Sequence, residues 1–114
     1  MGAERLKSRG RFKTVCVQGR SWASAMLVLR ALPNGLGRDR YGVSVSRRVG
    51  NAVVRNRAKR LIREAARQMP TKQGWDLVFI ARRPVAGADY HTVKRAVGEL
   101  LARAQLLDEG SGGP

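Results

Sequence analysis

The sequence predicts an α+β domain in which three helices pack on a small mixed sheet of about four strands, in the order α-β-β-β-α-β-α. The chain of 114 residues can bury one hydrophobic core but not two. Some segments have apolar residues at helical spacing, while others are alternately or continuously apolar, as strands are. We expect the domain to cover residues 8–108, between a basic tail at residues 1–7 and a flexible tail at residues 109–114, with the chain frayed through about Arg9.

The first predicted helix is short and lies near the amino terminus. Phe12, Val15 and Cys16 recur at helical spacing. Gly19 follows them, and glycine is typical of the position just beyond a helix. We therefore place this helix at about residues 8–18.

Of the strands predicted before the central helix, two can be located. The first is placed at residues 25–31, and the segment 33–37 that follows it is dense in turn residues. Residues 42–46 then alternate apolar with small polar side chains. This arrangement predicts an antiparallel hairpin of the two strands with one buried face.

The second half predicts helix, strand and helix. A long helix opens at Asn51 and runs to about Met69, where Pro70 closes it. Residues 75–81 are apolar at nearly every position, which predicts a strand inside the sheet. Asp89 can cap a last helix. The apolar stripe of that helix consists of Val93, Ala96, Val97, Leu100, Leu101 and Ala104.

The charge of the chain indicates a polyanionic partner. Twenty-three Lys and Arg residues stand against eight Asp and Glu, which gives a formal net charge of +15. Such a charge repels itself in the compact state unless an anion balances it. Because no segment approaches the roughly 20 apolar residues that span a bilayer, we expect nucleic acid, and not a membrane, to be the partner.

The cysteine content and the amino terminus indicate a cytoplasmic protein. Cys16 is the single cysteine and His91 the single histidine, so neither a disulfide within the chain nor a usual zinc site is expected. The basic start of the chain also lacks the apolar stretch of a secretory signal.

The long central helix is predicted to have two faces that do not overlap. At about 100° per residue, apolar side chains share one side and cations the other. The apolar side holds Val54, Ala58, Leu61, Ile62, Ala65 and Met69, and the other side holds Arg55, Asn56, Lys59, Arg60, Arg63 and Arg67. Arg47 and Arg48 extend the cationic surface before the helix.

This cationic row is better explained by phosphate binding than by a solvated surface. Like charges four residues apart destabilise a helix by a few tenths of a kcal/mol per pair. A solvated face normally mixes both signs, yet Glu64 is the only acid between Asn51 and Met69. Arginine can engage a phosphate through two parallel donors. Composition alone leaves open a structural RNA binder and a DNA-binding regulator with this helix in the major groove.

No catalytic or metal-binding residues are assigned to the protein. The acids are scattered and no pair suggests a two-metal nuclease site. His91 is expected to be a surface residue, because it has no evident partner.

The residues around Arg55-Asn56-Arg57 resemble the signature of the bacterial ribonuclease P protein family. The matching run is GVSVSRRVGNAVVRNRAKRLIRE at residues 42–64. The resemblance continues in Arg5-Leu6-Lys7, Phe12, Gly19, the IARRP run at residues 80–84 and Tyr90.

The resemblance implies an accessory subunit of a ribonucleoprotein enzyme. In this family a catalytic RNA and its Mg²⁺ ions cleave the 5′ leader from precursor tRNA, so the protein alone is not expected to cleave, and DNA is not an expected partner. The residues implied to contact the catalytic RNA are Arg55, Asn56, Arg57, Lys59, Arg60 and Arg63. The charge pattern adds Arg47, Arg48 and Arg67 to this RNA-binding set. The resemblance also implies that the central helix belongs to a left-handed βαβ crossover, a rare hand.

A cleft between the first helix and the sheet is implied to hold the single-stranded leader. Phe12 and Ser44 belong to it by resemblance. Two positions depart from the family pattern, because Cys16 stands where an aromatic residue is common and Arg30 where tyrosine is frequent. We expect leader binding in this chain to rely less on stacking and more on charge.

Overall fold

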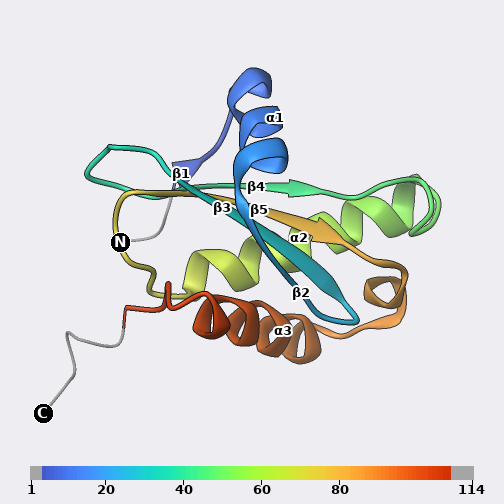
Figure 1. Ribbon diagram of the computed structural model, residues 1–114. Coiled ribbons are helices and arrows are strands. Elements are labelled where there is room, and N and C mark those ends of the chain that lie inside the picture. Colours follow the sequence, from blue (N-terminus) through green and yellow to red (C-terminus); the bar gives the residue numbers. More distant parts are fainter. Residues whose placement is uncertain (1–3, 109–114) are drawn as a thin grey trace, which may run out of the picture.

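The computed structural model describes residues 4–108, which form one five-stranded mixed sheet with helices on both faces (Figure 1). The predicted α+β class is confirmed, with five strands in place of about four. The elements follow in the order β1 (Glu4–Arg5), α1 (Arg9–Gln18), β2 (Arg20–Ala23), β3 (Leu27–Pro33), β4 (Arg40–Ser44), α2 (Ala52–Gln68), β5 (Trp75–Ala81), the 3-10 helix η1 (Arg83–Gly87) and α3 (Tyr90–Arg103).

The strand order is β1-β4-β5-β3-β2, which places the continuously apolar β5 at the centre. β5 pairs in parallel with β4 and antiparallel with β3. The predicted hairpin of residues 25–31 with residues 42–46 is therefore wrong, because β5 lies between these strands. A strand with apolar residues on both faces buries most apolar surface at the centre of a sheet. β5 therefore lies between β3 and β4 and prevents them from pairing with each other.

The hairpin that does form joins β2 to β3. Its turn contains none of the usual Gly or Pro signals. The Ser24 hydroxyl accepts hydrogen bonds from the backbone N–H groups of Met26 and Leu27, each at 3.2 Å. This side-chain turn is why the strand at residues 20–23 was missed from the sequence.

Each of the three α-helices begins at a side-chain cap. Ser8 Oγ accepts from the Arg11 N–H at 3.1 Å, Asn51 Oδ1 from Val54 at 3.0 Å, and Asp89 Oδ1 from Thr92 at 2.8 Å. The backbone hydrogen bond from Thr92 lowers the pKa of the Asp89 carboxyl, so this cap stays charged. These caps confirm the predicted starts of the three helices.

The sheet separates two cores of unequal size. The larger core packs α2 and α3 on one face, and α1 covers part of the other face with a small core around Leu6, Val15 and Val78. Figure 1 shows α1 on the opposite side of the sheet from α2 and α3. Because α1 is only ten residues long, part of this second face lies outside the small core.

The start of the described chain is ordered, so the expectation of a frayed segment through Arg9 is wrong for residues 4–9. β1 pairs in parallel with β4, with Arg5 opposite Tyr41, and the Leu6 side chain is only 8% exposed. Leu6 supplies the apolar anchor that the charged neighbours conceal in the sequence. The expected tails at residues 1–3 and 109–114 lie outside the described residues.

The central helix joins two parallel neighbouring strands, as a βαβ crossover does. α2 leaves the end of β4 and returns the chain to the start of β5. This places the amino end of α2 beside the ends of both strands. The left-handed sense of the crossover stays a prediction.

Candidate nucleic-acid interface

The two faces of α2 are real, but they overlap at Arg55. Ala58 and Ile62 are buried and Asn56 is exposed, as predicted. Arg55, however, is half-buried, and its Nε has no hydrogen-bond partner among residues 4–108. The expectation of non-overlapping faces is therefore wrong here, because Ile62 and the buried Ala66 lie only about 20° to either side of Arg55 around the helix axis.

Arg57 contacts the neighbouring α3 region. Its Nη2 donates a hydrogen bond of 3.0 Å to the carbonyl oxygen of Ala88, the residue between η1 and the cap of α3. No residue between 4 and 108 accepts a hydrogen bond from the other guanidinium N–H groups, which are available to a ligand. Within the triplet at residues 55–57, Asn56 is thus the one exposed residue.

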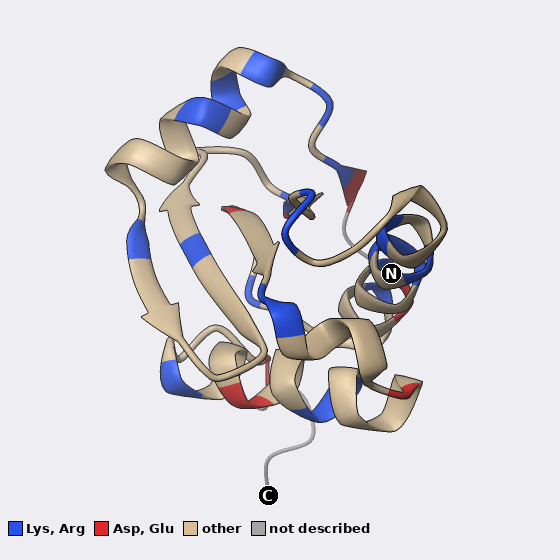
Figure 2. Cartoon of the chain, turned by 90° about the vertical axis from the view of Figure 1, so that its right-hand side faces the viewer, with Lys and Arg blue, Asp and Glu red and all other residues tan. Residues whose placement is uncertain are grey.

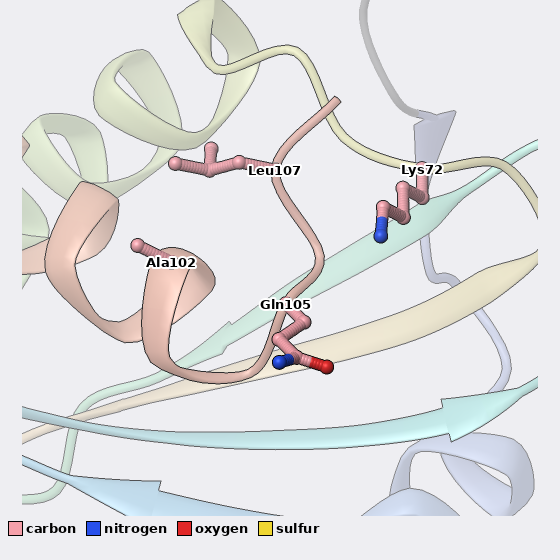
Figure 3. A pocket seen from close by; sticks show the side chains of 4 residues that line it. All are labelled: Lys72, Ala102, Gln105 and Leu107. Carbon is pink, nitrogen blue, oxygen red and sulfur yellow. The ribbon is translucent and has the colours of Figure 1, made fainter. Parts of the chain in front are cut away.

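The remaining predicted cations lie along α2 and in the turn before it. Arg67 pairs with Glu64 at 2.5 Å, and it is the one member of the predicted set with a carboxylate partner among residues 4–108. Figure 2 shows that Lys and Arg recur along α2 and on α1, with few acids between them. Arg47, Arg48, Arg60 and Arg67 are exposed, whereas Lys59 and Arg63 are half-buried.

The four predicted cleft residues come together on the α1 side of the sheet. The register aligns Gly42 of β4 with Val78 of β5 and Arg30 of β3, and Ser44 with Ile80 and Val28. Phe12 and Cys16 of α1 pack on the core of this same face. The Phe12 ring lies directly on Gly42, where an added Cβ would stand 2.6 Å from a ring carbon.

The polar chemistry of this cleft rests on Arg30. Burial raises the pKa of the Cys16 thiol, and the Arg30 guanidinium opposes this only in part. The thiol is therefore a neutral, half-buried side chain. Arg30 Nε is buried without a hydrogen-bond partner among residues 4–108, and such a donor costs about 1–3 kcal/mol until a ligand satisfies it.

Asp76 positions α1 over the cleft, and sequence reasoning missed it. The carboxylate is fully buried on β5 and accepts from Arg11 Nε at 2.6 Å, from Asn34 Nδ2 at 2.9 Å and from Arg40 Nε and Nη2 at 2.8 and 2.7 Å. Burial raises its pKa, but these bonds outweigh burial and lower the pKa to about 2. A charged residue inside the apolar run at residues 75–81 was the available signal, since a buried charge needs partners.

Two further features of residues 4–108 bear on other functions. Between residues 4 and 108, no group of three or more His, Cys, Asp or Glu side chains could hold a metal ion. None of the helices there is long and apolar enough to cross a membrane. His91 is exposed and its ring packs edge-on against Tyr90, so it is a surface residue as predicted.

Known proteins are similar to this chain in sequence and in fold. The family model described as Ribonuclease P matches residues 1–105. The ribonuclease P protein component of Caldanaerobacter subterraneus subsp. tengcongensis is 42% identical over 107 residues, which cover 92% of each chain. That of Dehalococcoides mccartyi strain CBDB1 is also 42% identical, over 94% of this chain and 89% of its own.

Solved structures agree with the sequence relatives. The RNase P protein of Staphylococcus aureus superposes with a TM-score of 0.81 at 29% identity and covers 93% of this chain and 99% of its own. That of Thermotoga maritima has a TM-score of 0.77 at 32% identity and covers 88% and 96%. The chain described here therefore belongs to the family of ribonuclease P protein components.

Proposed function

We propose that this chain docks on the catalytic RNA of ribonuclease P through α2 and holds the single-stranded 5′ leader of precursor tRNA in the cleft beneath α1. The RNA and its Mg²⁺ ions perform the phosphodiester hydrolysis, and the protein acts in the cytoplasm as an accessory subunit.

One observation carries the RNA-docking role. The exposed side of α2 and the turn before it present cations that are not neutralised by carboxylates of residues 4–108, apart from Arg67. Phosphates of a structured RNA can replace the missing counter-charges, and release of their condensed ions favours binding.

The cleft has the chemistry of a site for a single strand. Phe12 offers part of an aromatic ring, while Arg30 and Ser44 offer donors on the same sheet face. An aromatic surface beside a cation binds single-stranded nucleic acid with little sequence preference. Because the cleft holds one aromatic side chain beside the half-buried Arg30, charge contributes more to leader binding than stacking does.

The test is reconstitution with a ribonuclease P RNA and a precursor tRNA. Adding the chain should lower the Mg²⁺ concentration needed to release the 5′ leader, and shortening the leader to one nucleotide should weaken substrate binding. If the chain binds the RNA but leaves the Mg²⁺ requirement for cleavage unchanged, it is a structural RNA binder only. Cleavage by the protein without RNA would contradict the accessory role.

A further inference from the structure

A hollow of about 380 Å³ lies between β1 and the carboxyl-terminal half of α2. The residues that line it come from three separate elements. They are Arg5, Tyr41, Arg60, Arg63, Glu64 and Arg67. Four arginines thus line one hollow against a single carboxylate, and this excess of cations makes the electrostatic potential of the concave surface positive.

Most of this charge has no partner in the described chain. Glu64 binds Arg67 at 2.5 Å, and no carboxylate of residues 4–108 lies within 4.0 Å of Arg5, Arg60 or Arg63 in an ion pair. Three like charges held around one hollow repel each other. An anion in the hollow would relieve that repulsion and could accept paired hydrogen bonds from each guanidinium.

The hollow on the other side of β1 is a useful contrast. It is also lined by four cations, which are Arg5, Lys7, Arg38 and Arg40. There, Arg38 pairs with Glu4 at 2.8 Å and Arg40 with Asp76 at 2.7 Å. Two of the four cations of that hollow are thus paired, whereas only Arg67 of the four arginines is paired in the hollow beside α2.

The fold holds Arg5 at this position through its neighbours. The Glu4 N–H donates to the Asp39 carbonyl at 3.0 Å, and the Leu6 N–H donates to the Tyr41 carbonyl at 2.7 Å. The buried Leu6 side chain anchors the strand on the α1 core. The Arg5 side chain itself is exposed, so it contributes charge and not packing.

We propose that this hollow binds a backbone phosphate of the catalytic RNA and that Arg5 and Arg63 share that phosphate. The edge strand β1 is then part of the RNA interface, which extends from the exposed side of α2 to the start of the chain. This inference rests on the proposed docking of α2 on the RNA, because the hollow continues the same surface.

A double-mutant cycle on the intact chain tests the shared phosphate. Affinity for a ribonuclease P RNA is measured for Arg5→Ala, Arg63→Ala and the double variant across a range of salt. We expect each single change to weaken binding about 5- to 10-fold and the double change to weaken it by less than the product. The effects of Arg5→Ala and Arg48→Ala on affinity should instead multiply in the double variant, because Arg48 lies in the turn before the amino end of α2, away from the hollow.

Arg95→Ala is the matched control, because it removes one exposed cation from α3. Arg5→Lys keeps the charge and should restore part of the affinity. Thermal unfolding of each variant shows that the fold persists. If Arg5→Ala behaves as Arg95→Ala while Arg60→Ala weakens binding, this inference fails and the proposed function stands. If the unmodified chain shows no salt-dependent RNA binding, the proposed function itself fails.

Inorganic phosphate at constant ionic strength separates the two sources of a phosphate ligand. Competition that lowers RNA affinity more for the unmodified chain than for Arg5→Ala supports an RNA phosphate in the hollow. If inorganic phosphate binds the unmodified chain but does not change its RNA affinity, the ligand of the hollow is a free anion. That result would overturn the assignment.

Discussion

Asp76 shows how one buried carboxylate can organise a binding cleft. It joins Arg11 of α1 to Arg40 of β4, and thereby sets where α1 lies on the sheet. Replacing it by Asn keeps the shape but leaves two guanidinium groups without a counter-charge. We expect Asp76→Asn to lower the free energy of unfolding by about 3–5 kcal/mol in urea titrations. Glu4→Gln, which breaks the exposed pair with Arg38, should cost no more than about 1 kcal/mol.

The lowered pKa of Asp76 also predicts an acid-dependent stability. The pKa is about 2 in the folded chain against 3.8 as the ordinary value. The stabilisation is therefore fully present above about pH 4 and is lost as the pH falls toward 2, with a total of roughly 2 kcal/mol. Unfolding at pH 6 and at pH 2 measures this loss. An Asp76→Asn variant should lose correspondingly less stability over the same interval; an unchanged loss would contradict the assignment to Asp76.

Position 42 requires glycine because the Phe12 ring lies against its backbone, and not because of its backbone angles. An added Cβ would meet the Phe12 ring at 2.6 Å, so Gly42→Ala must displace Phe12 or the strand. We expect a loss of about 1–3 kcal/mol in stability and weaker leader binding in the reconstituted enzyme. Gly87→Ala is the control, since no heavy atom lies within 4 Å of its added Cβ. Equal effects of the two substitutions would exclude a role for the Phe12 contact.

At the scale of elements, periodic segments were predictable and strand partners were not. α2 and β5 lie within a residue or two of their expected ends, because helical spacing and a continuous apolar run are local patterns. The pairing of β3 with β5 depends on which strand is buried most deeply in the whole sheet. The short β1 has no periodicity of its own, and it is held by Leu6 and by β4.

The same limit applies to the candidate site. Spacing correctly placed most cations of α2, and the resemblance supplied cleft residues that the sheet register does bring to one face. Spacing did not reveal that Arg57 bonds to Ala88 or that Arg55 is half-buried. Those details depend on where η1 and α3 pack, which is set by long-range contacts.

The exposed side of α2 leads to a prediction about Mg²⁺. Arg60 is exposed and Arg63 half-buried on this side, and both lack carboxylate partners among residues 4–108. We expect Arg60→Ala and Arg63→Ala to reduce leader cleavage more at low than at high Mg²⁺, because divalent ions can partly replace a lost cation on RNA. Rates of leader release across a Mg²⁺ titration measure this. Equal losses at all Mg²⁺ concentrations would count against docking through α2.

At the scale of the whole molecule, the net charge of +15 does not act as one uniform field. Cations engaged inside the fold, such as Arg11 and Arg40, which share the carboxylate of Asp76, already have an internal partner. Those on α2 and the turn before it mostly do not, so RNA phosphates should replace only a part of the chain's counterions. This predicts a salt dependence set by the interface and not by the total charge.

With roughly six phosphate contacts, the logarithm of RNA affinity should fall against the logarithm of salt concentration with a slope of about −5. The slope is obtained from binding titrations at several salt concentrations. Removing Arg60 should make it shallower by about 1, whereas removing Arg95 on α3 should leave it unchanged. Equal shallowing by both changes would mean that the chain binds RNA through its diffuse charge, because a localised interface is the only arrangement in which the position of a lost cation matters.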